Sequence, residues 1–131
     1  MSITRFPNGI ESFTIPRDYT EVSAAATLNA TTDVGKTFYV TTANLEITLP
    51  ALSAGAQYVY TIVNGCPDGT SLLSVKPGSG DGISFITQVD NEKIKNTAVT
   101  SKRGDYVTVT SNSLGVFWVV NDAHGIWAKV A

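Results

Sequence analysis

Charged side chains are scarce in this sequence. Asp, Glu, Lys and Arg together make up 15 % of the 131 residues, against about 25 % in a typical soluble domain. Thr, Ser, Asn and Gly must therefore cover most of the surface. Such a surface suits an assembly, because few charges lose their hydration when it is buried.

Clusters of basic residues are also missing. The net charge is −2 at pH 7, and the basic residues are scattered apart from the pairs Lys93/Lys95 and Lys102/Arg103. Phosphate recognition requires clustered Lys and Arg. We therefore expect no nucleic-acid partner.

Long apolar runs are absent as well. No stretch reaches the roughly 20 residues that span a bilayer, and no charged-then-apolar leader opens the sequence. We expect a soluble protein that has no membrane partner and is not secreted.

Cysteine and histidine occur once each. Cys66 cannot form an internal disulfide or a metal-binding pair, and as a nucleophile it would have only His124 as a base. A lone cysteine is more often a small buried thiol than a catalytic group. We therefore predict that the protein is not an enzyme and has no catalytic residue, metal site or cofactor.

What the sequence does contain is a series of short runs in which apolar and polar residues alternate. Such runs occupy residues 36–41, 45–49, 57–63, 72–76, 83–89, 105–110 and 126–130, a wholly apolar run occupies residues 116–120, and Gly, Pro, Asn and Asp separate them. Period-two alternation between turn residues is typical of half-buried strands. The sequence predicts an all-β fold, a β-sandwich or jelly-roll-like barrel of about six to eight antiparallel strands.

Individual segments give more detailed expectations. The alternation in residues 105–110 predicts that Val107 and Val109 point inward, and the apolar residues 116–120 predict a central strand. Residues 121–125 are expected to form a turn, and the polar residues 90–97 an exposed loop.

Residues 1–32 differ from the rest and predict an extended N-terminal arm, which leaves residues 33–131 as the β-sandwich domain. Pro7 and Pro16 exclude a long helix here. An extended arm cannot bury its own apolar side chains, so it must dock on this domain, on a neighbouring subunit or on a larger partner. The residues that we expect to bind a neighbouring subunit or this larger partner are Ile3, Arg5, Phe6, Pro7, Asn8, Ile10, Phe13 and Ile15.

Four aromatic residues of the domain have two interpretations. Tyr58, Tyr60, Trp118 and Trp127 are candidates for the core or a subunit interface, where large aromatics are common. The same residues are also candidates for a sugar-binding platform.

A short adhesion-like tripeptide, Arg103-Gly104-Asp105, precedes one of the predicted strands. Gly-Asp also makes a good turn before a strand, and matches to such short motifs are common by chance. We therefore interpret it as a turn.

Several segments together resemble a known family. Residues 3–10 contain Arg5-Phe6-Pro7-Asn8-Gly9, which looks like the start of small structural proteins of tailed-phage heads. Residues 35–40, 47–51, 55–58 and 104–107, Trp118 and the terminal Gly125-Ile126-Trp127 follow a similar order. The chain thus resembles the capsid decoration (cement or head auxiliary) proteins of tailed bacteriophages over nearly its whole length.

The resemblance implies a virion structural protein that binds the outer surface of a phage capsid and stabilises it, commonly as a homotrimer. The partners would be the major capsid protein and further copies of the chain. The location would be the capsid exterior, after synthesis in the host cytoplasm. The alternative is a fibre-associated β module that binds a receptor or a glycan.

Overall fold

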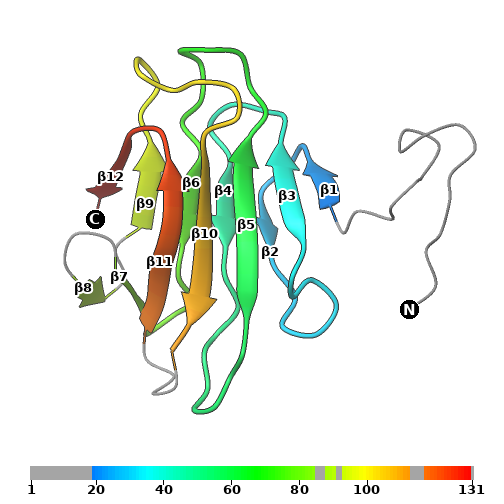
Figure 1. Cartoon of the computed structure of the whole chain (residues 1–131), viewed down its shortest axis with the longest axis vertical. Coiled ribbons are helices and arrows are strands. Elements are labelled where there is room, and N and C mark those ends of the chain that lie inside the picture. The colour runs from blue at the N-terminus through cyan, green and yellow to red at the C-terminus, as the bar shows by residue number, and fades with distance from the viewer. Residues whose placement is uncertain (1–18, 85–87, 91–92, 113–116, 131) are drawn as a thin grey trace, which may run out of the picture.

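Two sheets packed face to face form a β-sandwich (Figure 1). The computed structural model describes residues 19–84, 88–90, 93–112 and 117–130, which contain twelve strands. The larger sheet has the order β1 (Tyr19–Val22), β3 (Thr37–Val40), β5 (Val59–Asn64), β10 (Tyr106–Ser111), β11 (Phe117–His124), β7 (Gly82–Ser84) and β8 (Gln88–Asp90). The smaller sheet has the order β12 (Trp127–Val130), β9 (Lys93–Asn96), β6 (Ser74–Lys76), β4 (Glu46–Thr48) and β2 (Ala26–Thr27). In these residues no helix is long and apolar enough to cross a membrane.

The prediction of an all-β sandwich is confirmed, but the prediction that its strands are antiparallel holds for only half of the strand pairings. Within the described residues the strands number twelve rather than six to eight. Five of the ten strand pairings are parallel: β1 with β3, β3 with β5, β2 with β4, β4 with β6, and β7 with β11.

Four of the five parallel pairs arise because the first half of the chain winds between the two sheets. Strands β1, β3 and β5 belong to the larger sheet, and β2, β4 and β6, which alternate with them in sequence, belong to the smaller one. Each strand therefore returns beside the strand two positions earlier, running in the same direction. Antiparallel pairing dominates only later, where β10 lies between β5 and β11.

The turn residues of this first half make corners between the sheets. Asn44, just before β4, has a φ of 64°, and Gly35, just before β3, has a φ of 84°. Glycine adopts such left-handed conformations without strain, and asparagine does so more easily than most other residues. Sequence shows where the chain turns, but these residues serve a corner between sheets as well as a hairpin within one.

Alternating side chains fill the space between the sheets. Val107 and Val109 of β10 are fully buried, as predicted, and so are Ile62 of β5 and Ile47 and Val75 of the smaller sheet. The register aligns Phe38 with Ile62 and Ile47 with Val75. Each strand thus contributes one face to a single core.

Tyr60 is a core residue whose side chain carries a titratable group. Its side chain is fully buried, and its hydroxyl donates to the Asn29 carbonyl at 2.9 Å. Burial, with smaller contributions from Asp33 and Tyr58, raises the pKa of Tyr60 from 10.0 to about 12. The folded protein therefore holds the neutral phenol more tightly than the unfolded chain does.

This raised pKa predicts an alkaline loss of stability. The contribution of Tyr60 is complete below pH 10, falls as the unfolded phenol ionises, and is lost as the pH rises through about 12. Two pKa units correspond to about 3 kcal/mol. Urea unfolding between pH 8 and 12 should show this loss in the wild type, and a Tyr60→Phe variant should lack it. Parallel pH profiles for the two proteins would contradict the assignment.

The segment expected to be a loop at residues 90–97 contains a strand instead. Ile94 and Asn96 of β9 are fully buried, while Lys93 faces outward and pairs with Glu46 at 2.8 Å. The buried positions of β9 alternate, but the sequence does not show an alternation of apolar and polar residues because one buried position holds an asparagine. The turn expected at residues 121–125 is also shorter, since β11 continues to His124.

The boundary between arm and domain lies earlier than predicted. Strand β1 pairs within the larger sheet and β2 within the smaller one. Leu28 is buried, and its backbone amide donates a hydrogen bond to the Thr48 carbonyl at 2.8 Å. Residues 19–28 therefore belong to the sandwich, not to an arm that ends at residue 32. Residues 1–18 lie outside the described residues.

Candidate functional site

The predicted attachment residues cannot be placed in the fold. All of them precede Tyr19 and lie outside the described residues: Ile3, Arg5, Phe6, Pro7, Asn8, Ile10, Phe13 and Ile15. What can be placed is the strand to which this segment is joined. That strand, β1, forms one edge of the larger sheet as described.

The four aromatic candidates of the domain lie in or against the core. Tyr60 and Trp118 are fully buried and Trp127 is 5 % exposed, while Tyr58 is partly buried against the same cluster. The Trp118 ring lies between two tyrosines, with centroid distances of 5.7 Å to Tyr60 and 6.1 Å to Tyr58. These side chains stabilise the sandwich and are not displayed as a sugar platform.

One end of the sandwich collects most of the remaining polar contacts, and we call it the loop end. It consists of the loops at residues 65–73 and 97–105 and the turn between β11 and β12 (Figure 1). Asn64, fully buried, joins two of these segments, since its side chain donates to the Lys102 carbonyl at 2.9 Å and accepts from the Cys66 amide at 2.8 Å.

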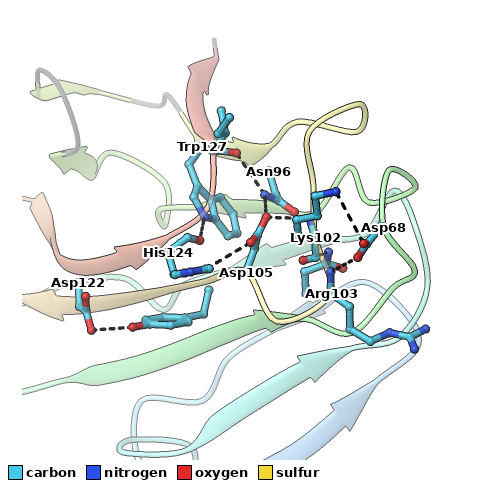
Figure 2. Close-up of polar contacts among 11 residues, drawn as sticks. Asp68, Asn96, Lys102, Arg103, Asp105, Asp122, His124 and Trp127 are labelled. Carbon is cyan, nitrogen blue, oxygen red and sulfur yellow. Dashed lines mark hydrogen bonds and ion pairs between the residues drawn. The ribbon is translucent and has the colours of Figure 1, made fainter.

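A buried carboxylate organises the loop end. Asp105 is only 1 % exposed. Its Oδ2 accepts hydrogen bonds from the Asn96 side chain at 3.1 Å and from the Lys102 amide at 2.9 Å (Figure 2). Its Oδ1 accepts no hydrogen bond and lies 3.4 Å from Nδ1 of His124. The carboxylate thus ties β9, the loop before β10 and the end of β11 together.

The turn between β11 and β12 closes tightly over this carboxylate. Gly125 has a φ of 93°, and a Cβ added there would lie 2.2 Å from Cγ of Asp105. The turn is held further by Trp127, whose indole donates to the His124 carbonyl at 2.9 Å, and by Asn96, which donates to the Ile126 carbonyl at 3.1 Å. Only glycine fits both the conformation and the space at this position.

The contact between Asp105 and His124 lacks the further group that acyl-transfer chemistry would need. The imidazole stacks on Tyr106 with centroids 5.9 Å apart, and no hydroxyl or thiol of the described residues is hydrogen-bonded to it. In the described part of the chain, no group of three or more His, Cys, Asp or Glu residues could hold a metal ion. The arrangement is best explained as a structural contact.

The adhesion-like tripeptide is built into the same end. Asp105 is buried, so its carboxylate is not displayed to a receptor, and Gly104 has a φ of 98° in the turn before β10. Arg103 and Gly104 are exposed, but without the carboxylate they do not present the motif. The structure therefore uses these residues to start a strand.

Cys66 is 2 % exposed, and its thiol lies 3.7 Å from the Val40 carbonyl oxygen. Burial raises the pKa of the Cys66 thiol, which the nearby Arg103 lowers only in part. A buried neutral thiol is a poor nucleophile.

An open groove of about 620 Å³ lies beside the loop end. Its lining includes Glu21 of β1, Tyr39 of β3 and Arg103 of the loop before β10. Arg103 is held in place by two hydrogen bonds, from its amide to Asp68 at 2.9 Å and from its Nε to the Gly65 carbonyl at 3.1 Å. Glu21 and Arg103 form no ion pair with each other.

Sequence reasoning missed this groove and the Asp105 contacts. The sequence pattern places Glu21 in the arm, Tyr39 in an ordinary strand and Asp105 in a turn, and none of these positions signals a shared surface. No family model matches this chain, and no curated protein matches it either.

Proposed function

We propose that this chain is a virion structural protein that binds the outer surface of a phage capsid as a trimer and stabilises the shell, without catalytic turnover. The observation that carries the proposal is the position of the first described strand. Residues 1–18, which contain the Arg5–Gly9 motif, are joined to the sandwich at β1, an edge strand of the larger sheet as described. A segment attached at an edge can extend to a neighbouring protein without disturbing the core.

The composition supports the same role. Residues 1–18 contain Ile3, Phe6, Ile10, Phe13 and Ile15 in only eighteen positions. Burying such side chains against a capsid protein would remove apolar surface from water at each contact. Ligands that bind only the assembled shell stabilise it by mass action, and several copies on one particle add avidity.

The alternative, a fibre-associated sugar-binding module that uses Trp118 and Trp127, receives no support at those residues. Both indoles are buried, at 0 % and 5 % exposure, so truncating either one would damage the fold before it affected a ligand.

Deleting residues 1–16 tests the capsid proposal. The deletion spares every described strand, so far-UV circular dichroism and the midpoint of thermal unfolding should change little. Binding to expanded capsids of the phage, measured by co-sedimentation, should fall at least 100-fold because the attachment segment is gone. Capsid binding by the deleted protein at wild-type affinity would contradict the proposal.

A matched control comes from the sandwich. Val99 lies in the loop before β10 and is 92 % exposed, so Val99→Ser removes one exposed apolar side chain far along the sequence from the arm. It should leave capsid binding unchanged. A double substitution within the arm, Phe6→Ala with Ile10→Ala, should reproduce most of the loss that the deletion causes.

A further inference from the structure

The outer face of the larger sheet carries no charged side chain over three neighbouring strands. In β5 and β10, alternation with the buried Ile62, Val107 and Val109 directs every second side chain outward. These outward side chains are Val59, Thr61 and Val63 in β5 and Tyr106, Thr108 and Thr110 in β10. Thr37 and Tyr39 continue the surface onto β3, which lies beside β5 (Figure 1). We call these residues of β3, β5 and β10 the uncharged face.

The outer face of the smaller sheet is different. There the buried Ile47, Val75 and Ile94 alternate with the outward residues of β4, β6 and β9. Four of these outward residues are charged, namely Glu46, Lys76, Lys93 and Lys95. Removing charges from water is costly, and the centres of protein interfaces are depleted of them. Of the two outer faces, the uncharged one is therefore the better suited to be covered by another protein.

Several polar groups of the uncharged face already have partners within the chain. The hydroxyls of Thr61 and Thr108 are hydrogen-bonded to each other at 3.0 Å. The Tyr106 hydroxyl donates to Asp122 at 3.2 Å, and its ring stacks on His124. A polar group that keeps its hydrogen bond costs little to remove from water. Covering the face therefore leaves few groups unpaired.

An apolar row crosses the uncharged face. The register places Val63 between Tyr39 and Tyr106. Val63 is 8 % exposed and does not belong to the cluster of core residues between the sheets, while Tyr39 is 37 % exposed. Tyrosines around a small apolar centre are typical of protein interfaces.

The absence of charge favours a second copy of the chain over a different protein. Residues near a symmetry axis meet their own copies, so a charge there would face the same charge. A different partner imposes no such limit, because it can supply the opposite charge. The nearest charges of the described strands lie at the rim, at Glu21 of β1 and Asp122 of β11. The uncharged face is therefore complementary to itself.

We propose that the uncharged face is the surface through which copies of this chain meet, with β5 and β10 closest to the three-fold axis. The proposal rests on the trimer of the proposed function and assigns its interface to the sandwich. Capsid attachment remains with residues 1–18.

A charge placed on the uncharged face tests the assignment. Thr61→Glu would bring like charges together at the axis, so it should weaken association about 100-fold or more. Thr48→Glu is the matched control, since Thr48 is a half-buried strand threonine on the charged face, in register with Lys76. Light scattering after size-exclusion chromatography measures the mass at about 100 μM, a concentration roughly 100-fold above a micromolar dissociation constant.

The wild type and Thr48→Glu should have masses near three times the 13.9 kDa of one chain, and Thr61→Glu should have the mass of one chain. Far-UV circular dichroism checks that each variant is folded. A wild type with the mass of one chain would overturn the proposal, and so would a folded Thr61→Glu protein that stays assembled.

Thr110→Lys separates the added charge from the lost hydrogen bond. It leaves the bond between Thr61 and Thr108 in place and adds the opposite charge at another outward position of β10. It should dissociate the assembly as Thr61→Glu does. Assembly that survives Thr110→Lys would overturn the proposal.

The protein that lacks residues 1–16 distinguishes this proposal from the proposed function. It should keep the mass of the assembly, because the interface lies in the sandwich, although it loses capsid binding. Dissociation of this protein would overturn the interface proposal. An assembled wild type that does not bind capsids would contradict the proposed function alone. A monomeric wild type whose capsid binding is lost with Thr61→Glu would overturn the interface proposal and assign the face to the capsid protein.

Discussion

Replacing Asp105 by alanine is expected to lower the free energy of unfolding by about 3 kcal/mol. The substitution removes the acceptor of two hydrogen bonds, from the fully buried Asn96 side chain and from the Lys102 amide. One N–H of the Asn96 side chain and the Lys102 amide would lose their acceptor where water has limited access, and each such loss costs about 1–3 kcal/mol. Urea unfolding at pH 7, followed by tryptophan fluorescence, measures the effect.

Two further variants serve as controls for Asp105→Ala. Asp105→Asn keeps one oxygen that can accept from Asn96 or Lys102, so it should lose clearly less stability than the alanine variant. Asp68, which is exposed and 3.7 Å from Lys102, provides a second carboxylate at the same end, and Asp68→Ala should have a much smaller effect. If Asp105→Ala and Asp68→Ala cost the same, the loop end is not organised by the buried carboxylate.

The second large effect is expected for Gly125→Ala, which should also cost about 3 kcal/mol. The added Cβ would lie 2.2 Å from Cγ of Asp105, and the backbone has a φ of 93°. Overpacking costs about 1–3 kcal/mol, and the left-handed conformation adds about 1–2 kcal/mol for a residue with a side chain. The midpoint of thermal unfolding should fall by about 10 °C for a domain of this size.

A glycine variant that meets no neighbour separates the two contributions. Gly80 has a φ of 82°, and a Cβ added there would have nothing within 4 Å, so Gly80→Ala should cost only about 1 kcal/mol. The double variant Gly125→Ala with Asp105→Ala should lose less than the sum of the two single variants, because one substitution removes the group that the other strikes. Strict additivity would show that the close approach to Asp105 is not the cause.

The strands of this protein could be predicted from their local pattern. Alternation in residues 105–110 places Val107 and Val109 in the core, and the structure buries both. The pattern failed in β9, where Asn96 occupies a buried position. Its burial depends on Asp105 and Ile126, which lie 9 and 30 residues away. A polar residue at a core position cannot be recognised until its partners are known.

The order of the strands could not be predicted from the same information. Gly35 and Asn44 mark turns in the sequence, yet a corner between sheets and a hairpin within one use the same left-handed residues. What decides between them is which apolar faces meet, and this depends on contacts between distant strands. The parallel winding of β1 to β6 is therefore a property of the whole core.

The candidate surfaces were hidden for a related reason. Asp105 looks like an ordinary turn residue in the sequence because its burial depends on Asn96 of β9, His124 of β11 and Gly125 of the turn that follows β11. Tyr39 and Tyr106 are 67 positions apart in the sequence and come into one row, with Val63 between them, only through the register of β3, β5 and β10. Composition, by contrast, is visible without a fold, and the low content of charged residues favours an assembly.

Imaging of the virion tests the central proposal most directly. Cryo-electron microscopy of particles with and without the gene for this chain should show extra density on the capsid exterior only in the first case. The density should fit three copies of the sandwich around a symmetry axis. An additional connection to the major capsid protein should start from β1, the strand that residues 1–18 precede. Identical capsid surfaces in the two preparations would contradict the proposal.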